Sequence, residues 1–203
     1  MLKSLILATD LDDVILQFVP QFVKFHNFVY PEISLRTKDF HSYNFPEVLK
    51  VSTEETKKRL QDFYYSPFHK EIKLMPGALK AFYSLKKVGF KIFVITGRHK
   101  STFDITRELI EKRIPGNLLE DILYTNAHDS NGAKIKKSDM CIKIGSQTLI
   151  DDDLMHIEDC CSVGIKTFVY SHTWNKGFLP LEAIRTNSWK ILEEKIIKAY
   201  SLF

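Results

Sequence analysis

The stretch LILATDLDDVILQF, residues 5–18, decides the fold class because it joins an apolar strand to a cluster of acids. Its first residues, 5–8, form a continuous apolar run, which is typical of a strand covered on both faces in a parallel sheet. Asp10, Asp12 and Asp13 follow directly. Carboxylates held this close together repel one another, and a hard divalent cation, Mg²⁺ by preference, offsets that repulsion by taking their oxygens as ligands.

Two later segments repeat this pattern of an apolar run that ends in polar residues. FKIFVITGR ends in Thr96, Gly97 and Arg98, and QTLIDDD ends in the acids of residues 151–153. Helical patterns alternate with these strands, which predicts a doubly wound parallel α/β sheet with right-handed crossovers. The carboxyl ends of such strands share one edge of the sheet, where ligands bind. We therefore expect these polar residues to gather at one site.

Apolar periodicity and capping residues predict the remaining elements of the sheet and its helices. Gly89 is expected to end the helix that begins at Ala78. Further helices are expected over residues 101–113, in SDMCIKIG and over residues 188–200. Strands are expected over residues 4–9, in FKIFVITG, in DILYTNA up to about Tyr124, in QTLIDDD and in GIKTFVYS.

Residues 17–72 differ in composition from the rest of the chain. They hold 12 of the 25 aromatic residues, and the first of these recur at helical spacing from Phe18 to Phe28. An irregular stretch around FHSYNFPEV follows, and Ser52 is expected to cap a second helix. We interpret this segment as a small helical cap with a core of its own, inserted after the first strand of a core formed by residues 1–16 and 73–203.

Composition narrows the class of protein and its partners. A net charge of +4 without a block of basic residues does not predict binding to a nucleic-acid polymer. No stretch approaches the length of a membrane span, and the first apolar run is too short for a signal peptide. The three cysteines lack the spacing of a zinc site or of a disulfide framework. We expect a cytoplasmic protein with reduced, buried thiols.

A carboxylate-bound cation beside a hydroxyl and a lysine suits a phosphate group. The cation and the lysine neutralise phosphoryl oxygens, while Thr96 and nearby backbone N–H groups donate hydrogen bonds to them. One aspartate of such a site attacks phosphorus, and its neighbour protonates the leaving oxygen and later activates water.

The motifs and their order resemble the haloacid dehalogenase-like superfamily of phosphatases. The first motif reads Asp10-Leu11-Asp12-Asp13-Val14, Thr96 ends the second strand, and a lysine precedes the strand that ends in TLIDD. The resemblance implies that Asp10 is the nucleophile and Asp12 the general acid and base. It also implies that Mg²⁺ is held by Asp10, the backbone carbonyl of Asp12, and Asp152. Asp151 would orient the loop or bind a water of the metal.

The same resemblance implies the groups that bind phosphate. Thr96 and Gly97 follow the second strand, and Arg98 either contacts phosphate or covers a helix terminus. The motif lysine is one of three neighbouring residues, Lys134, Lys136 and Lys137. Lys137 is favoured because it immediately precedes the short helix. Asp153 is expected to cap the helix that follows the acids.

Within this superfamily the sequence looks most like the 5'(3')-deoxyribonucleotidase group. The inserted cap, the segment Lys-Ser-Asp-Met-Cys at 137–141, and TWN at 173–175 carry that likeness. Thr173 stands where those relatives often have Pro, and Asp13 stands where they usually have Gly. The implied substrate is a nucleoside monophosphate. A phosphatase of a sugar phosphate or another small metabolite, or a binding or regulatory protein without turnover, remains an alternative.

Overall fold

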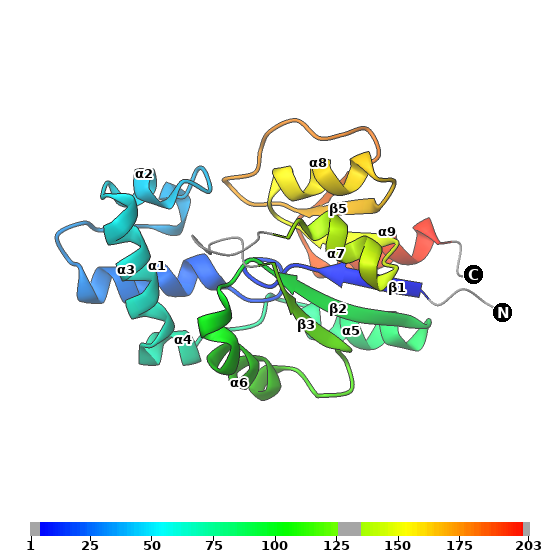
Figure 1. Cartoon of the computed structure of the whole chain (residues 1–203), viewed down its shortest axis with the longest axis horizontal. Helices are drawn as coiled ribbons and strands as arrows, with labels where there is room; N and C mark the ends of the chain where they lie inside the picture. Colours follow the sequence, from blue (N-terminus) through cyan, green and yellow to red (C-terminus); the bar gives the residue numbers. More distant parts are fainter. Residues whose placement is uncertain (1–4, 126–134, 201–203) are drawn as a thin grey trace.

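A six-stranded parallel sheet forms the centre of the computed structural model, which describes residues 5–125 and 135–200 (Figure 1). The strand order is β3-β2-β1-β4-β5-β6. This confirms the predicted doubly wound α/β class. The strands are β1 Leu5–Thr9, β2 Phe90–Thr96, β3 Asp121–Tyr124, β4 Thr148–Asp151, β5 Lys166–Tyr170 and β6 Ile184–Thr186.

The short edge strand β6 was not predicted from the sequence. Its three residues pair with the end of β5, from Phe168 to Tyr170. A strand of this length gives too few alternations to produce a period-two signal. It follows Pro180 and an exposed loop, a setting more typical of a turn than of a strand.

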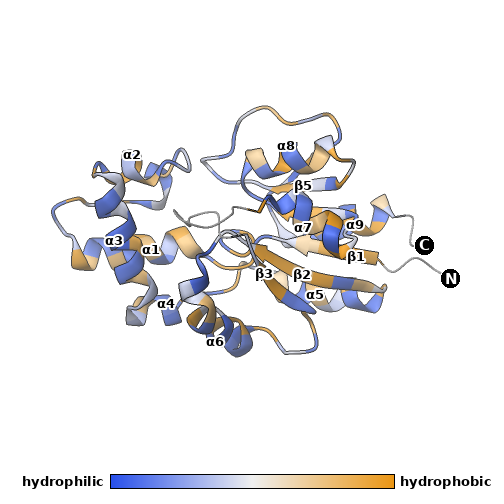
Figure 2. Cartoon of the chain, in the orientation of Figure 1, coloured by the Kyte–Doolittle hydropathy of each residue, from blue (hydrophilic) through white to orange (hydrophobic). Residues whose placement is uncertain are grey.

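Helices cover both faces of the sheet, as expected for this class. In Figure 1, α5 and α9 lie behind the strands, and α7 and α8 lie in front of them. Figure 2 shows strand β2 as strongly hydrophobic between these layers. The helices of the core are α5 Ala78–Lys87, α6 Phe103–Arg113, α7 Lys137–Ile144, α8 Leu154–Ser162 and α9 Trp189–Ala199.

Two expected helix ends have the predicted local geometry. Gly89 has φ +97°, a left-handed conformation that glycine adopts readily, and it lies just beyond the end of α5. The side chain of Asp153 accepts a hydrogen bond from the N–H of Met155 at 2.9 Å and so caps α8. Both predictions are confirmed.

Residues between β1 and α5 form a separate group of helices at the left of Figure 1. Ser52 caps one of them by accepting from the N–H of Glu55 at 3.1 Å, as predicted. The two connections to the sheet run side by side, with Gln17 N–H donating to the carbonyl of Lys73 at 2.9 Å. These helices are α1 Phe18–Val29, α2 Phe45–Leu49, α3 Thr53–Tyr64 and α4 Pro67–Lys70.

Three details of this segment differ from the sequence-based expectations. The stretch expected to be irregular contains α2, with Pro46 in its first turn. Phe28 lies on the exposed side of α1 rather than in the core. The segment also lacks a core of its own, because Phe22 and Phe63 belong to one buried cluster that continues to Leu7 of the sheet.

The described residues bear on two further expectations. Cys141 and Cys160 are buried, Cys161 is half-buried, and all three are free thiols. Within residues 5–125 and 135–200, no helix is both long and apolar enough to cross a membrane.

Candidate active site

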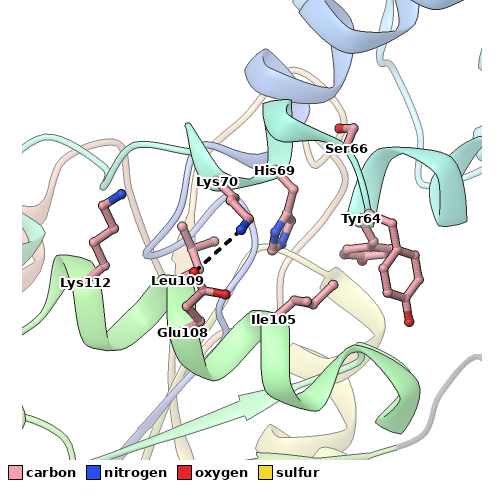
Figure 3. A pocket seen from close by; sticks show the side chains of 9 residues that line it. Tyr64, Ser66, His69, Lys70, Ile105, Glu108, Leu109 and Lys112 are labelled. Carbon is pink, nitrogen blue, oxygen red and sulfur yellow. Dashed lines mark ion pairs between the residues drawn. The ribbon is translucent and has the colours of Figure 1, made fainter.

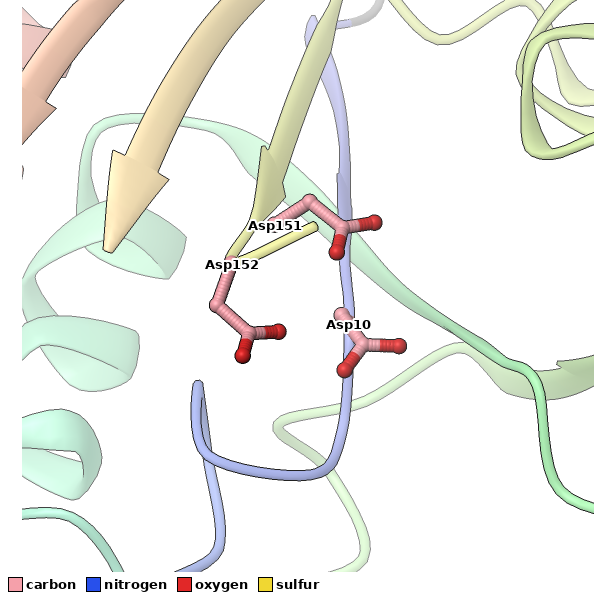
Figure 4. Close-up of side chains that lie close together, drawn as sticks. All are labelled: Asp10, Asp151 and Asp152. Atoms are coloured by element: carbon pink, nitrogen blue, oxygen red, sulfur yellow. The ribbon is translucent and has the colours of Figure 1, made fainter. Parts of the chain in front are cut away.

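The carboxyl ends of β1 and β4 bring three buried carboxylates together (Figure 4). Asp10 follows β1, and its backbone N–H donates to the carbonyl of Ile150 at 2.8 Å, which fixes the two strand ends side by side. Asp151 ends β4 and Asp152 follows it. Each carboxylate has an oxygen within 4.8 Å of an oxygen of the other two. The sequence predicted this meeting of acids from two strands.

Lys137 lies in the first turn of α7 and reaches into this cluster. Its Nζ donates to Oδ1 of Asp10 and, at 2.7 Å, to Oδ2 of Asp151, and its side chain is 3% exposed. Lys136 is 64% exposed and pairs with Asp159 on the surface. Lys134 lies outside the described residues. The structure thus places the favoured lysine, Lys137, among the acids.

Burial and mutual repulsion raise the proton affinity of these carboxylates. Burial raises the pKa of Asp10 to about 7, although the Lys137 ammonium opposes that shift. Burial, followed by the charges of Asp10 and Asp151, raises the pKa of Asp152 well above its usual range. Burial lowers the pKa of Lys137, but the two acids outweigh burial and raise it above its ordinary value. When all three acids are ionised, the single ammonium of Lys137 leaves the cluster with excess negative charge.

That excess charge fits a divalent cation. Oxygen ligands alone, from closely spaced carboxylates, are the donor set that Mg²⁺ prefers. A positive ion would relieve the repulsion that raises the pKa values of Asp10 and Asp152. The residues present therefore fit Mg²⁺, and they include Asp151 in addition to the two carboxylates expected from the sequence.

The TWN segment holds Asp152 in place, a role that the sequence did not assign. Trp174 donates from Nε1 to Oδ2 of Asp152 at 2.8 Å. Asn175 donates from Nδ2 to the backbone carbonyls of Asp152 and Tyr170, both at 2.8 Å. The sequence contains a Trp and an Asn shortly after a strand. Only the folded structure shows that both contact Asp152.

Asp12 is not part of this group of three carboxylates and pairs with Arg98. The guanidinium donates to Oδ2 of Asp12 from Nε at 2.8 Å and to Oδ1 from Nη2 at 2.7 Å. The sequence had left phosphate contact and the covering of a helix terminus open for Arg98. The structure instead directs its guanidinium to the second aspartate of the first motif.

Thr96 and Gly97 lie at the end of β2, next to β1. The Thr96 side chain is buried, and its Oγ1 accepts from the N–H of Arg98 at 3.2 Å. Gly97 is half-buried. Their expected roles in binding phosphate stay predictions.

Solved structures match this fold over nearly the whole chain, whereas no protein-family model and no curated protein matches the sequence. A HAD family hydrolase from Deinococcus radiodurans R1 with bound phosphate and sodium has a TM-score of 0.69 at 16% identity, covering 98% of this chain and 97% of that one. A predicted phosphatase from Clostridium acetobutylicum has a TM-score of 0.69 at 16% identity, and the match covers 96% of this chain and 99% of that one. A predicted phosphoglycolate phosphatase from Haemophilus somnus 129PT has a TM-score of 0.64 at 14% identity, and the match covers 96% of this chain and 100% of that one. The chain has the haloacid dehalogenase-like fold. Identities this low establish the fold alone.

Asp13 has a structural role in this chain. Its φ of +56° is left-handed, a conformation that glycine adopts more readily than other residues. Both carboxylate oxygens accept from the N–H of Val19 at 3.1 Å, in the first turn of α1. Burial, and then the charge of Asp12, raise the pKa of Asp13 well above its usual range. Asp13 thus caps α1 and lies outside the carboxylate cluster.

We expect Asp13→Asn to be at least as stable as the wild type, because Asn keeps the cap and tolerates left-handed backbone without burying charge. Asp13→Ala loses the cap and keeps the strain, so its free energy of unfolding should fall about 2 kcal/mol below that of Asp13→Asn. Urea denaturation of both variants measures the difference. Equal stability of the two variants would show that the contact with Val19 does not stabilise α1.

Proposed function

We propose that the protein is a Mg²⁺-dependent phosphatase of small phosphomonoesters that works through an aspartyl-phosphate. The observation that carries the proposal is the placement of Asp10 at the end of β1, with Lys137 on one carboxylate oxygen and two further buried acids beside it. A nucleophile held by a cation, next to a candidate metal site, is the arrangement that phosphoryl transfer requires.

Two displacements complete the reaction. An oxygen of Asp10 attacks phosphorus, the bond from phosphorus to the leaving oxygen breaks, and Asp12 gives its proton to that oxygen. Asp12 then takes a proton from water, the water oxygen attacks phosphorus, and the bond to Asp10 breaks to release phosphate. Lys137, Thr96 and Gly97 would bind the phosphoryl oxygens. Mg²⁺, held by Asp10, Asp152 and the backbone carbonyl of Asp12, would neutralise phosphoryl charge when bound.

A nucleoside monophosphate is the proposed substrate, and residues 17–72 are the proposed cap. Asp10 is only 7% exposed, and the cap contacts the core beside the site. Thr173 donates from Oγ1 to the carbonyl of Phe40 at 2.8 Å, and the ring of Tyr43 lies 6.5 Å from that of Trp174. A covered site of this kind favours a small substrate over a nucleic-acid polymer. The choice of a nucleotide rests on sequence resemblance.

Phosphate release from a panel of nucleoside monophosphates and sugar phosphates tests the proposal, with Mg²⁺ and with EDTA. We expect release that needs Mg²⁺ and is confined to nucleotides. Hydrolysis of sugar phosphates instead would keep the mechanism and overturn the substrate. No release by folded protein that binds Mg²⁺ would favour a binding or regulatory role without turnover.

The contact between Trp174 and Asp152 predicts a change in metal affinity. Trp174→Phe removes the N–H that orients the carboxylate but keeps an aromatic ring, which in the wild type stacks on His172 at 4.2 Å. Loss of such an outer hydrogen bond should weaken Mg²⁺ binding about tenfold. Isothermal titration calorimetry with Mg²⁺ measures the effect. An unchanged dissociation constant would argue against Asp152 as a ligand.

A further inference from the structure

Arg98 forms a buried junction between the core and the inserted helices. Besides its two bonds to Asp12, its Nη1 donates to Nε2 of His69 in α4 at 3.0 Å and to Oγ1 of Thr106 in α6 at 2.9 Å. The guanidinium carbon lies 5.2 Å from the ring centre of Tyr64 in α3. The side chain is 1% exposed. The guanidinium therefore donates hydrogen bonds to protein acceptors on several sides.

His69 is suited to hold one side of this junction. Burial, and then the charge of Arg98, lower the pKa of His69 to about 4. The ring is therefore neutral near pH 7, and Nε2 accepts the hydrogen bond from Arg98. The ring also lines a cavity of about 220 Å³ between α4 and α6, beside the pair of Lys70 and Glu108 (Figure 3).

We propose that Arg98 is the positioning residue for Asp12, and that His69 of the inserted helices fixes Arg98 in turn. The inference rests on the proposed function, in which Asp12 exchanges protons with the leaving oxygen and with water. A planar guanidinium that holds both carboxylate oxygens fixes the orientation of Asp12 as well as its place. Because Arg98 is enclosed by protein acceptors, it acts through Asp12 rather than on phosphate.

This arrangement affects the two chemical steps differently. Both oxygens of Asp12 accept hydrogen bonds from Arg98, and this geometry suits the step in which Asp12 takes a proton from water. Protonation of the leaving oxygen requires the proton to reside on Asp12, so one of the two bonds to Arg98 opens before that step. Loss of Arg98 should therefore slow the attack of water on the aspartyl-phosphate in particular.

Steady-state and rapid-mixing kinetics of Arg98→Met with p-nitrophenyl phosphate test the inference. The p-nitrophenolate leaving group departs without a proton, so the first displacement should proceed and give a burst of product. The attack of water should then limit turnover, and kcat should fall about 100-fold with KM changed less than about threefold.

Arg59→Met is the matched control. Arg59 is also buried, donates from Nη1 to a histidine, His26, at 2.8 Å, and pairs with Glu55, but it lies within the inserted helices away from Asp12. This control should lose stability and keep its kcat. Equal losses of burst and steady-state rate in Arg98→Met, or the same kinetics in both variants, would overturn the inference. A wild type that releases no phosphate would overturn the proposed function and the inference together.

His69 supplies a second test that keeps Arg98 in place, including the case in which Arg98→Met does not fold. His69→Gln keeps an acceptor for Nη1 of Arg98, whereas His69→Leu removes it. We expect His69→Gln to keep kcat within about twofold and His69→Leu to lower it about tenfold. Equal values of kcat for these two variants would overturn the role of His69.

Discussion

Asp10→Asn should fold and bind its substrate but release no phosphate, with kcat reduced by at least about 10⁴-fold. Asn cannot form the acyl-phosphate bond, although its amide oxygen still accepts from Lys137. The neutral side chain also removes one of three mutually repelling buried carboxylates. The free energy of unfolding without metal should therefore equal or exceed that of the wild type, while the stabilisation by Mg²⁺ should shrink.

Asp153→Asn is the control for this experiment. Asp153 is the third consecutive acid of the segment, yet it caps α8, and Asn is an equally good cap. Its kcat should match that of the wild type. Phosphate release by pure Asp10→Asn protein would contradict the nucleophile assignment, and a large loss of kcat in Asp153→Asn would mean that this residue does more than cap α8.

The sequence was sufficient to predict those parts of the site that depend on local order. Asp10 and Asp151 each end an apolar strand, so the topology of a parallel sheet alone places them at the same edge. Lys137 begins a helix that follows β3, and this position, read together with the family resemblance, favoured it over Lys136. These inferences needed the direction of each strand but no side-chain geometry.

Contacts between distant segments could not be predicted in this way. Asp12 and Arg98 are separated by 86 positions, and Trp174 lies 22 positions beyond Asp152. Neither pair produces a periodic pattern, because each depends on how loops pack after the sheet has formed. The aromatic spacing of α1 indicated burial but not that its rings would join the core of the sheet.

Lys137→Met is expected to separate catalysis from metal binding. The ammonium neutralises Asp10 and Asp151, so its removal leaves buried carboxylates without their partner. The free energy of unfolding without metal should fall by about 3 kcal/mol, the scale for breaking a buried ion pair. The value of kcat should fall by about 100-fold or more, because a cation on the transferring phosphoryl group is lost. The greater negative charge should meanwhile tighten Mg²⁺ binding.

Lys136→Met provides the comparison, since Lys136 precedes Lys137 in the chain but pairs with Asp159 on the surface. Its stability, metal affinity and kcat should all stay close to those of the wild type, because exposed ion pairs contribute little. Calorimetric titration with Mg²⁺ and kinetics on the same samples measure both effects for the two variants. Weaker Mg²⁺ binding in Lys137→Met would mean that the lysine organises the carboxylates for the metal. Tighter binding with lost turnover would mean that it acts on the phosphoryl group.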